Sequence, residues 1–254
     1  MSPFVIGFIG FLIVAFSVVP GLLLWWPSRG DRTSRSDLGV ALMTGALIAF
    51  AVLTIQVLIE RNNRLRDDAR QRADARQSFE LTLSLQNNLT GIRLERQDLR
   101  GFYLYGKILK KAVLVSADLR SATLSWANLT EAKMHSAKLV GAIMNNAIMT
   151  RARLDNANLE AAILTDARML GASLSGASII DADLSSAFLR FGDLRGAHLE
   201  GASFAGATLT GANMSNATVD DGTSFVGAVY DRSTVWPPGV NQTRCRRGVC
   251  EASH

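Results

Sequence analysis

Three histidines, two cysteines and many serines are the residues of this chain whose types suit nucleophilic or metal chemistry. A serine nucleophile needs a histidine base within hydrogen-bond reach and a third group that orients the base. The chain repeats a pattern every five residues, described below. In that pattern His135 and His198 stand at positions expected to point outward on different faces, with no nucleophile beside either. Serine is abundant where the chain is expected to turn a corner, a position that suits a turn-capping hydroxyl. We therefore expect no catalytic residues.

The C-terminal tail holds Cys245, Cys250 and His254 in the pattern C-x4-C-x3-H. Three ligands at a chain end fall short of the four that a structural zinc site uses, so we expect no metal site. The thiols are expected to be reduced if the tail is cytoplasmic and to form a local disulfide otherwise. No glycine-rich loop follows a strand and opens a helix, which disfavours a nucleotide cofactor. The sequence predicts a non-enzymatic protein with no cofactor and no small-molecule substrate.

A period of five residues dominates the second half of the chain. All 27 positions at steps of five from Leu89 to Val219 are apolar, and of the 22 positions two residues earlier, from Ala112 to Ala217, 21 are alanine. On an α-helix five residues advance about 500°, so these positions would share no face. On a flat strand an odd step reverses the side chain. Only a path that turns a corner in every repeat keeps each apolar residue inward.

Between corners the chain is extended, so the central apolar residue and the alanine two before it both point inward. The residues on either side of the central one point outward, and the next residue makes the corner. Ten of the 27 repeats have glycine at that corner position, where a turn may need unusual dihedral angles. The corners alone do not fix how many sides close one coil.

The stretches "ADLRS" from Ala117, "ANLTE" from Ala127, "ANLEA" from Ala157 and "ADLSS" from Ala182 show the pattern A-(D/N)-L-x-x. This pattern resembles the pentapeptide-repeat family, as does the ending "YDRSTVWPPGV". The resemblance implies a right-handed quadrilateral β-helix with four repeats, or twenty residues, per coil. The fold class is then mainly β, a pentapeptide-repeat solenoid preceded by two transmembrane α-helices.

Those helices are predicted from two uncharged segments, residues 4–26 and 38–59, each long enough to cross about 30 Å of hydrocarbon. The first lacks the basic start and the cleavage site of a signal peptide. Neither holds an ionisable residue, so we expect an anchor and not a transporter.

We expect a multi-pass inner (plasma) membrane protein of bacterial type. The arginine counts favour a cytoplasmic repeat domain with both termini inside, because six arginines follow the second span and three lie between the spans. The segment after the second span is expected to continue it as a helix. It is either a solvated spacer or a contact for anionic lipid. Its candidate lipid-binding residues are Arg61, Arg64, Arg66, Arg70, Arg72 and Arg76.

Departures from the repeat mark its ends. Ile92, Gln97, Phe102 and Lys107 occupy early alanine positions, which predicts a distorted first coil capped by the entering helix. After Val219 the register shifts by one residue, which predicts a bulge at residues 220–222. Phe225, Tyr230 and Val235 are then expected at inward positions, followed by a stop at Trp236-Pro237-Pro238.

Some soluble members of the family are understood to protect DNA gyrase by presenting an acidic, DNA-like rod. Residues 89–236 hold 15 basic and 14 acidic residues, so this rod is near neutral and DNA mimicry is disfavoured. Outward apolar residues on adjoining faces instead suggest a protein-binding patch. The candidate residues are Trp126, Ile143, Ile148, Ile163, Leu170, Phe188 and Phe191.

The predicted organisation is a two-helix anchor (1–60), a charged juxtamembrane helix (61–88), a β-helix (89–236) and a tail (237–254). The predicted function is a membrane-anchored scaffold whose rod binds an unknown protein partner or a second copy of the chain. The alternative is a regulator that inhibits an enzyme. Binding to nucleic acid is not expected.

Overall fold

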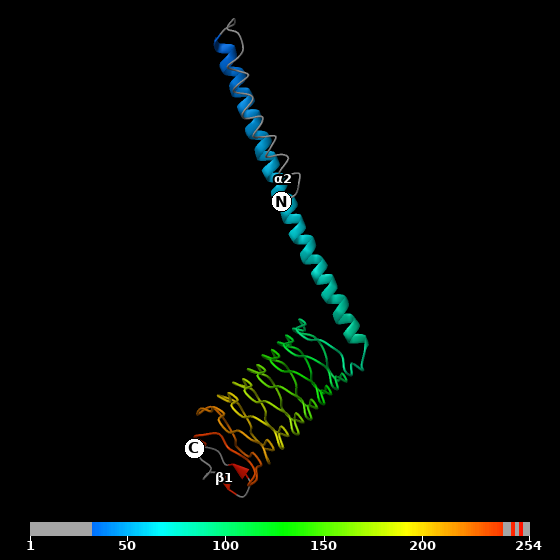
Figure 1. Ribbon diagram of the computed structural model, residues 1–254, viewed down its shortest axis with the longest axis vertical. Helices are drawn as coiled ribbons and strands as arrows, with labels where there is room; N and C mark the ends of the chain where they lie inside the picture. The colour runs from blue at the N-terminus through cyan, green and yellow to red at the C-terminus, as the bar shows by residue number, and fades with distance from the viewer. Residues whose placement is uncertain (1–31, 241–244, 247–248, 251–254) are drawn as a thin grey trace. The chain divides into compact units, whose positions relative to one another are not determined.

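A computed structural model describes residues 32–240, 245–246 and 249–250, with side chains described for residues 43–240 (Figure 1). The chain divides into two compact units, Met1–Arg72 and Ala73–His254. The elements are one long helix, α2 (Arg32–Leu85), and two short strands, β1 (Cys245–Arg246) and β2 (Val249–Cys250), which pair antiparallel. The first predicted span, residues 4–26, lies outside the described residues.

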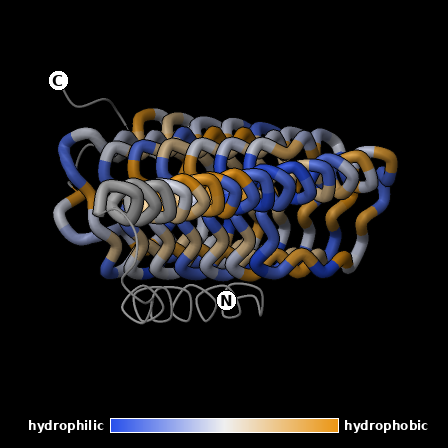
Figure 2. The backbone as a smooth tube through the Cα atoms, turned by 90° about the horizontal axis from the view of Figure 1, so that it is seen from above, coloured by the Kyte–Doolittle hydropathy of each residue, from blue (hydrophilic) through white to orange (hydrophobic). Residues whose placement is uncertain are grey.

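Helix α2 contains the whole second predicted span and continues without a break through the charged segment to Leu85, as the sequence predicts. Among the described residues, α2 is the one helix that is both long enough and apolar enough to cross a membrane. The mean hydropathy of its most apolar window is 1.9. The change from apolar to hydrophilic residues along this helix is visible in Figure 2.

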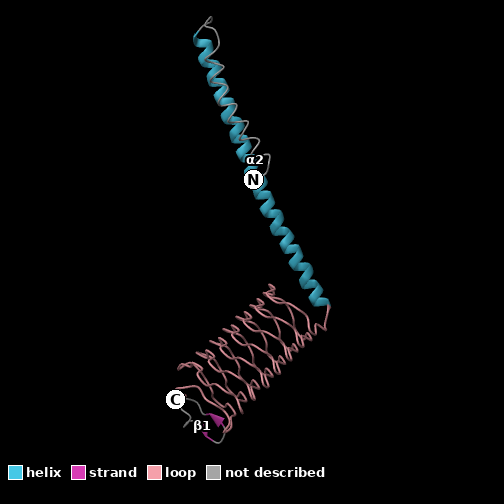
Figure 3. Cartoon of the chain, viewed as in Figure 1, coloured by secondary structure: helices cyan, strands magenta, loops and turns pink. Residues whose placement is uncertain are grey.

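The repeats form a coil of twenty residues, which confirms four repeats per turn. Parallel bridges join residues twenty apart from Asn88↔Ile108 to His198↔Thr218. Each corner-to-corner segment contributes a single bridged residue to this ladder, so the coils appear as loops in Figure 3 although they pair as β-structure. The Leu109 amide, for example, donates to the Asn128 carbonyl at 2.8 Å.

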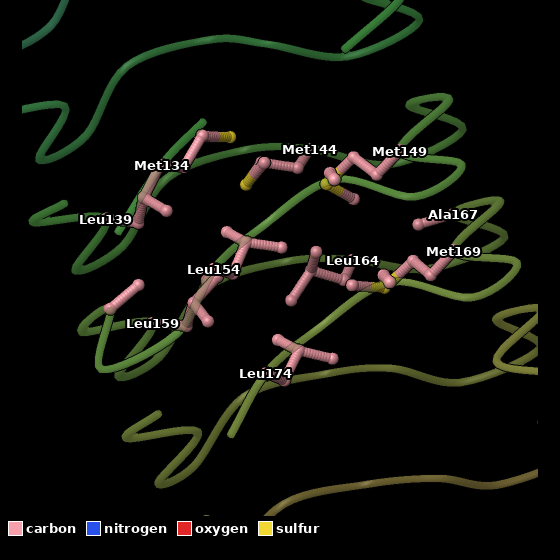
Figure 4. Packing of buried hydrophobic residues seen from close by; sticks show 14 of the residues in the cluster. Met134, Leu139, Met144, Met149, Leu154, Leu159, Leu164, Ala167, Met169 and Leu174 are labelled. Carbon is pink, nitrogen blue, oxygen red and sulfur yellow. The ribbon is translucent and has the colours of Figure 1, made fainter. Parts of the chain in front are cut away.

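The interior consists of stacked leucine, methionine and alanine side chains. The central positions from Leu99 to Met214 and the alanines two residues before them are buried, most with no exposed surface. Figure 4 shows Met144, Leu164 and their neighbours in rows that run from coil to coil. Each such leucine or methionine contributes roughly 1.5–3 kcal/mol by its burial. The small alanine at the other inward position leaves room for the larger side chain.

Every corner residue from Gly91 to Asn216 adopts a left-handed backbone conformation, with φ between 52° and 70°. Each corner is a β-turn closed by a hydrogen bond such as the one from the Ala112 amide to the Leu109 carbonyl, 3.1 Å long. Ten corner residues are glycine, as expected, and sixteen are not. The coil therefore imposes this conformation on whichever residue stands at the corner.

The end of α2 covers the first coil. Leu83 is buried in the core, and the rings of Phe79 and Phe102 lie 6.0 Å apart. Lys107 is buried at an alanine position and donates hydrogen bonds to the Ser84 carbonyl (2.5 Å) and to Asn87 Oδ1 (3.1 Å). The helical cap is confirmed, and it explains the large residues at these alanine positions. The prediction that the first coil is distorted is wrong for its backbone pairing, because its bridges to the second coil keep the regular spacing of twenty residues.

The far end departs from the repeat in two steps instead of one. Ser203 bridges Ser224, which confirms the insertion at residues 220–222 and the inward position of Phe225. Asn213 then bridges Val235, a step of 22 residues, so a second residue is inserted.

This second insertion corrects the prediction for Val235, which points outward and is 44% exposed. Trp236 takes the place expected for Val235. Its ring packs edge-on against Phe225 at 5.1 Å and Tyr230 at 5.3 Å.

The two insertions share one local structure. Asp220 Oδ1 accepts hydrogen bonds from the amides of Gly201, Gly222 and Thr223. Asp231 Oδ1 likewise accepts from the amides of Gly211 and Ser233. These hydrogen bonds lower the pKa of both carboxyl groups, with the Gly201 amide as the largest cause for Asp220 and the Ser233 hydroxyl for Asp231.

Candidate functional site

The coil has four sides, which we name by the first central residue on each: the Leu89, Leu94, Leu99 and Leu104 sides. The same side recurs every twenty residues. On each side the residues just before and just after the central one point outward, and the corner residue follows them. The surface of the rod therefore consists of columns of residues twenty apart.

Exposed large hydrophobic residues gather on two adjoining sides. All of those between Tyr103 and Phe191 lie on the Leu104 and Leu89 sides or at the corners that follow them. They are Tyr103, Tyr105, Ile108, Trp126, Ile143, Ile163, Leu170, Phe188 and Phe191. Between the same limits the Leu94 and Leu99 sides have none. The apolar surface thus continues around one edge of the rod.

The predicted patch residues fall within this surface, but the structure does not join them all. Ile143 and Ile163 bridge each other in adjacent coils of the Leu104 side. Ile148 and Phe188 share a column of the Leu89 side but are separated by Arg168, and Ile148 is only partly exposed. Leu170 lies on the same side, while Trp126 and Phe191 lie at corners.

The sequence analysis missed Tyr103, Tyr105 and Ile108, which extend the apolar surface toward the first coil. The two tyrosine rings stack at a centroid distance of 5.9 Å. Tyr103 and Ile108 stand twenty residues before Thr123 and Asn128, in the columns that lead to Ile143 and Ile148. Because Thr123 and Asn128 are polar, they separate the apolar residues of each column in the sequence.

The corner aromatics hold a conformation that disfavours them. Trp126 has φ 62° and Phe191 has φ 56°, where a side chain costs about 1–2 kcal/mol relative to the usual backbone. Trp126 is 55% exposed and Phe191 58% exposed, so the buried part of each residue offsets a strain of this size. Glycine stands at the same corner in other coils, for instance Gly106 and Gly211. The exposed part of each ring is available for contact with another molecule.

Charged residues on the Leu94 and Leu99 sides largely neutralise one another within a repeat. Asp98 pairs with Arg100 at 2.7 Å, Asp118 with Arg120 at 2.6 Å, and Asp193 with Arg195 at 2.8 Å. In each pair the guanidinium hydrogen bond holds the pKa of the carboxyl below its ordinary value. These sides present paired charges to solvent.

The Leu89 side has a different charge pattern. Between Asn88 and Gly211 its outward and corner positions hold five basic residues and one acidic residue, Glu131. The basic residues are Lys110, Lys111, Arg151, Arg168 and Arg190, and all five are exposed. Lys111 lies 3.8 Å from Glu131, and within residues 43–240 none of the other four lies within 4.0 Å of a carboxylate. This side carries net positive charge.

The two described histidines, His135 and His198, do not stand in a catalytic arrangement. His135 Nδ1 lies 2.7 Å from Asp155 Oδ2, and the Ser173 hydroxyl donates to Asp155 Oδ1. The carboxylate therefore stands between the histidine and the serine, whereas a serine nucleophile needs the histidine in that place. His198 Nδ1 lies 3.1 Å from the Thr218 hydroxyl. Both arrangements are links between neighbouring coils.

No group of three or more metal-ligating residues occurs in the part of the chain that the structure describes. Cys245 and Cys250 are opposite each other in the β1–β2 pair, and His254 lies outside the described residues.

The arginines proposed as lipid contacts are divided in the structure. Arg64 and Arg70 lie beside Glu60 and Asp67 on α2, at 3.8 and 3.9 Å, and both are exposed. Arg61, Arg66 and Arg72 are also exposed. Arg76 instead pairs with Asp98 at 2.7 Å and lies over the Phe102 ring at 5.3 Å, so it belongs to the cap of the first coil.

The family model for pentapeptide repeats matches the chain in eight copies, over residues 88–125, 108–151, 127–166, 152–190 and 193–221. The chain belongs to the pentapeptide-repeat family. No curated protein matches it.

Solved structures of the same family are similar to it. HetL, a protein involved in heterocyst differentiation regulation from the cyanobacterium Nostoc, is 26% identical over 59% of this chain and 78% of its own, with a TM-score of 0.36. A thylakoid-lumen protein from Arabidopsis thaliana is 34% identical over 39% of this chain and 69% of its own, with a TM-score of 0.33. QnrB1, a plasmid-mediated fluoroquinolone resistance protein, is 16% identical over 58% of this chain and 88% of its own, with a TM-score of 0.39.

Proposed function

We propose that this protein is a membrane-anchored scaffold that binds a partner protein through the exposed apolar residues of the Leu104 and Leu89 sides. The observation that carries the proposal is their confinement to two adjoining sides. Scattered exposed hydrophobic residues are ordinary on a soluble surface, but their concentration on one part of it marks an interaction site.

The size of this surface suits a protein interface. Seven coils at about 4.8 Å and two sides of about 10 Å each give roughly 670 Å² for both sides, polar residues included, which is of the same order as the ~800 Å² per partner of a standard interface. The Trp126 and Phe191 rings add support, because aromatic residues supply much of the binding energy in such interfaces.

The anchor in this proposal is the apolar part of α2, together with residues 4–26. The excess of arginine after residue 59 favours a cytoplasmic rod. Helix α2 continues for 26 residues past Ile59, a rise of about 39 Å, and its charged residues act as a spacer. Protease digestion of sealed inverted and right-side-out vesicles tests this orientation. The repeat domain is cleaved only in inverted vesicles if it faces the cytoplasm.

The binding surface is tested by the triple variant Ile143→Asp, Ile163→Asp and Phe188→Asp in the full chain. The three replaced side chains are 38%, 41% and 49% exposed, so the coil should remain folded. A matched control places aspartate at Lys138, His198 and Thr218, three exposed positions of the Leu99 side. The complex isolated in mild detergent should lose its partner in the first variant and keep it in the control. Partner recovery that is equal in both variants would refute the proposal.

A further inference from the structure

The basic residues of the Leu89 side are interleaved with its apolar residues. Arg168 stands in one column between Ile148 and Phe188, and bridges both. Arg190 follows Leu170 in the next column, and its guanidinium lies over the Phe191 ring at 5.3 Å. Neighbouring coils are about 4.8 Å apart, so each of these apolar residues has a positive charge within one or two coils.

Four of these five charges have no anionic partner within 4.0 Å among residues 43–240. On the Leu94 and Leu99 sides five arginines pair with a carboxylate of the same repeat, although Arg96, Lys133 and Lys138 do not. On the Leu89 side the four basic residues without a carboxylate within that distance are Lys110, Arg151, Arg168 and Arg190. Interfaces place opposite charges against each other, because like charges in contact oppose binding. The occupant of this side must therefore be anionic as well as apolar.

We propose that the partner binds the Leu89 side through an acidic protein segment. Its carboxylates meet Lys110, Arg151, Arg168 and Arg190, while its apolar side chains pack against Leu170, Phe188 and their neighbours. This inference rests on the proposed function and adds the charge and the chemical class of the partner's binding segment.

Three other occupants fit less well. A lipid surface is flat, whereas the apolar surface turns an edge of the four-sided coil, from Ile143 on the Leu104 side to Phe188 on the Leu89 side. A nucleic acid backbone would meet the charges but would offer little for Ile148 and Leu170 to bury. A second copy that used the same surface would place its own basic residues against these.

Site-specific photo-crosslinking tests the inference on the full chain in native membranes. A benzoylphenylalanine replaces Phe188, with His198 of the Leu99 side as the control position, and mass spectrometry identifies the crosslinked peptide. We expect a peptide of another protein with an excess of Asp and Glu over Lys and Arg. The double variant Arg168→Glu and Arg190→Glu should lower the yield at least fivefold. The matched variant Lys133→Glu and Lys138→Glu, which makes the same change of charge on other sides, should leave the yield unchanged.

The outcomes separate this inference from the proposed function. A crosslinked protein segment with neutral or positive net charge overturns the acidic partner but leaves the scaffold in place. Equal effects of the two double variants do the same. Crosslinks only to lipid, nucleic acid or a second copy of the chain also overturn the inference. The absence of any adduct at position 188 overturns both.

Discussion

Replacing Lys107 should loosen the cap of the rod without affecting its centre. The ammonium group is buried, with 6% of the residue exposed, and donates to the Ser84 carbonyl and to Asn87 Oδ1. Hydrogen bonds from a charged group are worth about 1.5–3 kcal/mol. Lys107→Met keeps the aliphatic part of the side chain and removes the donor. Every 1.4 kcal/mol changes an equilibrium constant about tenfold, so we expect local opening of the cap to become roughly ten to a hundred times more frequent.

Native-state hydrogen exchange on the full chain measures this opening directly. Peptides that cover residues 79–94 should exchange faster in Lys107→Met, while peptides in the middle of the rod keep the wild-type rate, because each coil contacts only its neighbours. Lys133→Met, at an exposed position, is the control and should change neither. Unchanged exchange at residues 79–94 would show that Lys107 does not hold the helix. A uniform increase along the rod would show that the coils unfold as one unit.

Three further predictions concern the core, the far end and the corners. Leu154→Ala removes a fully buried side chain and should lower the free energy of unfolding by about 2–5 kcal/mol in urea titration, whereas Leu170→Ala, 43% exposed, should change it by less than about 1 kcal/mol. The pKa of Asp220 and Asp231 is lower in the folded chain than in the unfolded one, so their stabilisation is present above the unfolded value and is lost as the pH falls through the folded value. Opening of residues 220–236, measured by hydrogen exchange relative to the intrinsic amide rate at each pH, should therefore become more frequent in acid, and less steeply so in Asp220→Asn/Asp231→Asn; an equal change in both proteins contradicts this. Trp126→Gly and Phe191→Gly relieve the left-handed strain and should leave thermal stability unchanged or raise it by up to about 1 kcal/mol, while partner binding weakens; a loss of stability would mean that the rings serve the fold.

The sequence predicts the coil because its constraints are repeated. A leucine in every fifth position and an alanine two residues before it specify which side chains face inward, and each repeat states this again. The helical cap was also predictable, because Phe102 and Lys107 do not fit an alanine row unless something else covers them. The first insertion was predicted from the shift of Phe225 relative to Val219.

Contacts between distant segments were not predictable in this way. The second insertion was missed because Val235 and Trp236 are both apolar, and only the hydrogen bonds of Asp231 and the Trp236 contacts decide which one points inward. The contact of Arg76 with Asp98 joins a helix to a coil, and no spacing in the sequence indicates it. The apolar surface was only partly found, because its columns are interrupted by polar residues such as Thr123 and Arg168.

The two insertions near the C-terminus also limit how the rod can grow. Bridged residues are twenty apart through most of the ladder, then 21 apart at Ser203 and Thr208, and 22 apart at Asn213. The last coil therefore has a longer circumference than the coils before it. A regular twenty-residue coil from another molecule would not match its corners or its bridging residues. This mismatch opposes end-to-end addition at the terminal coil.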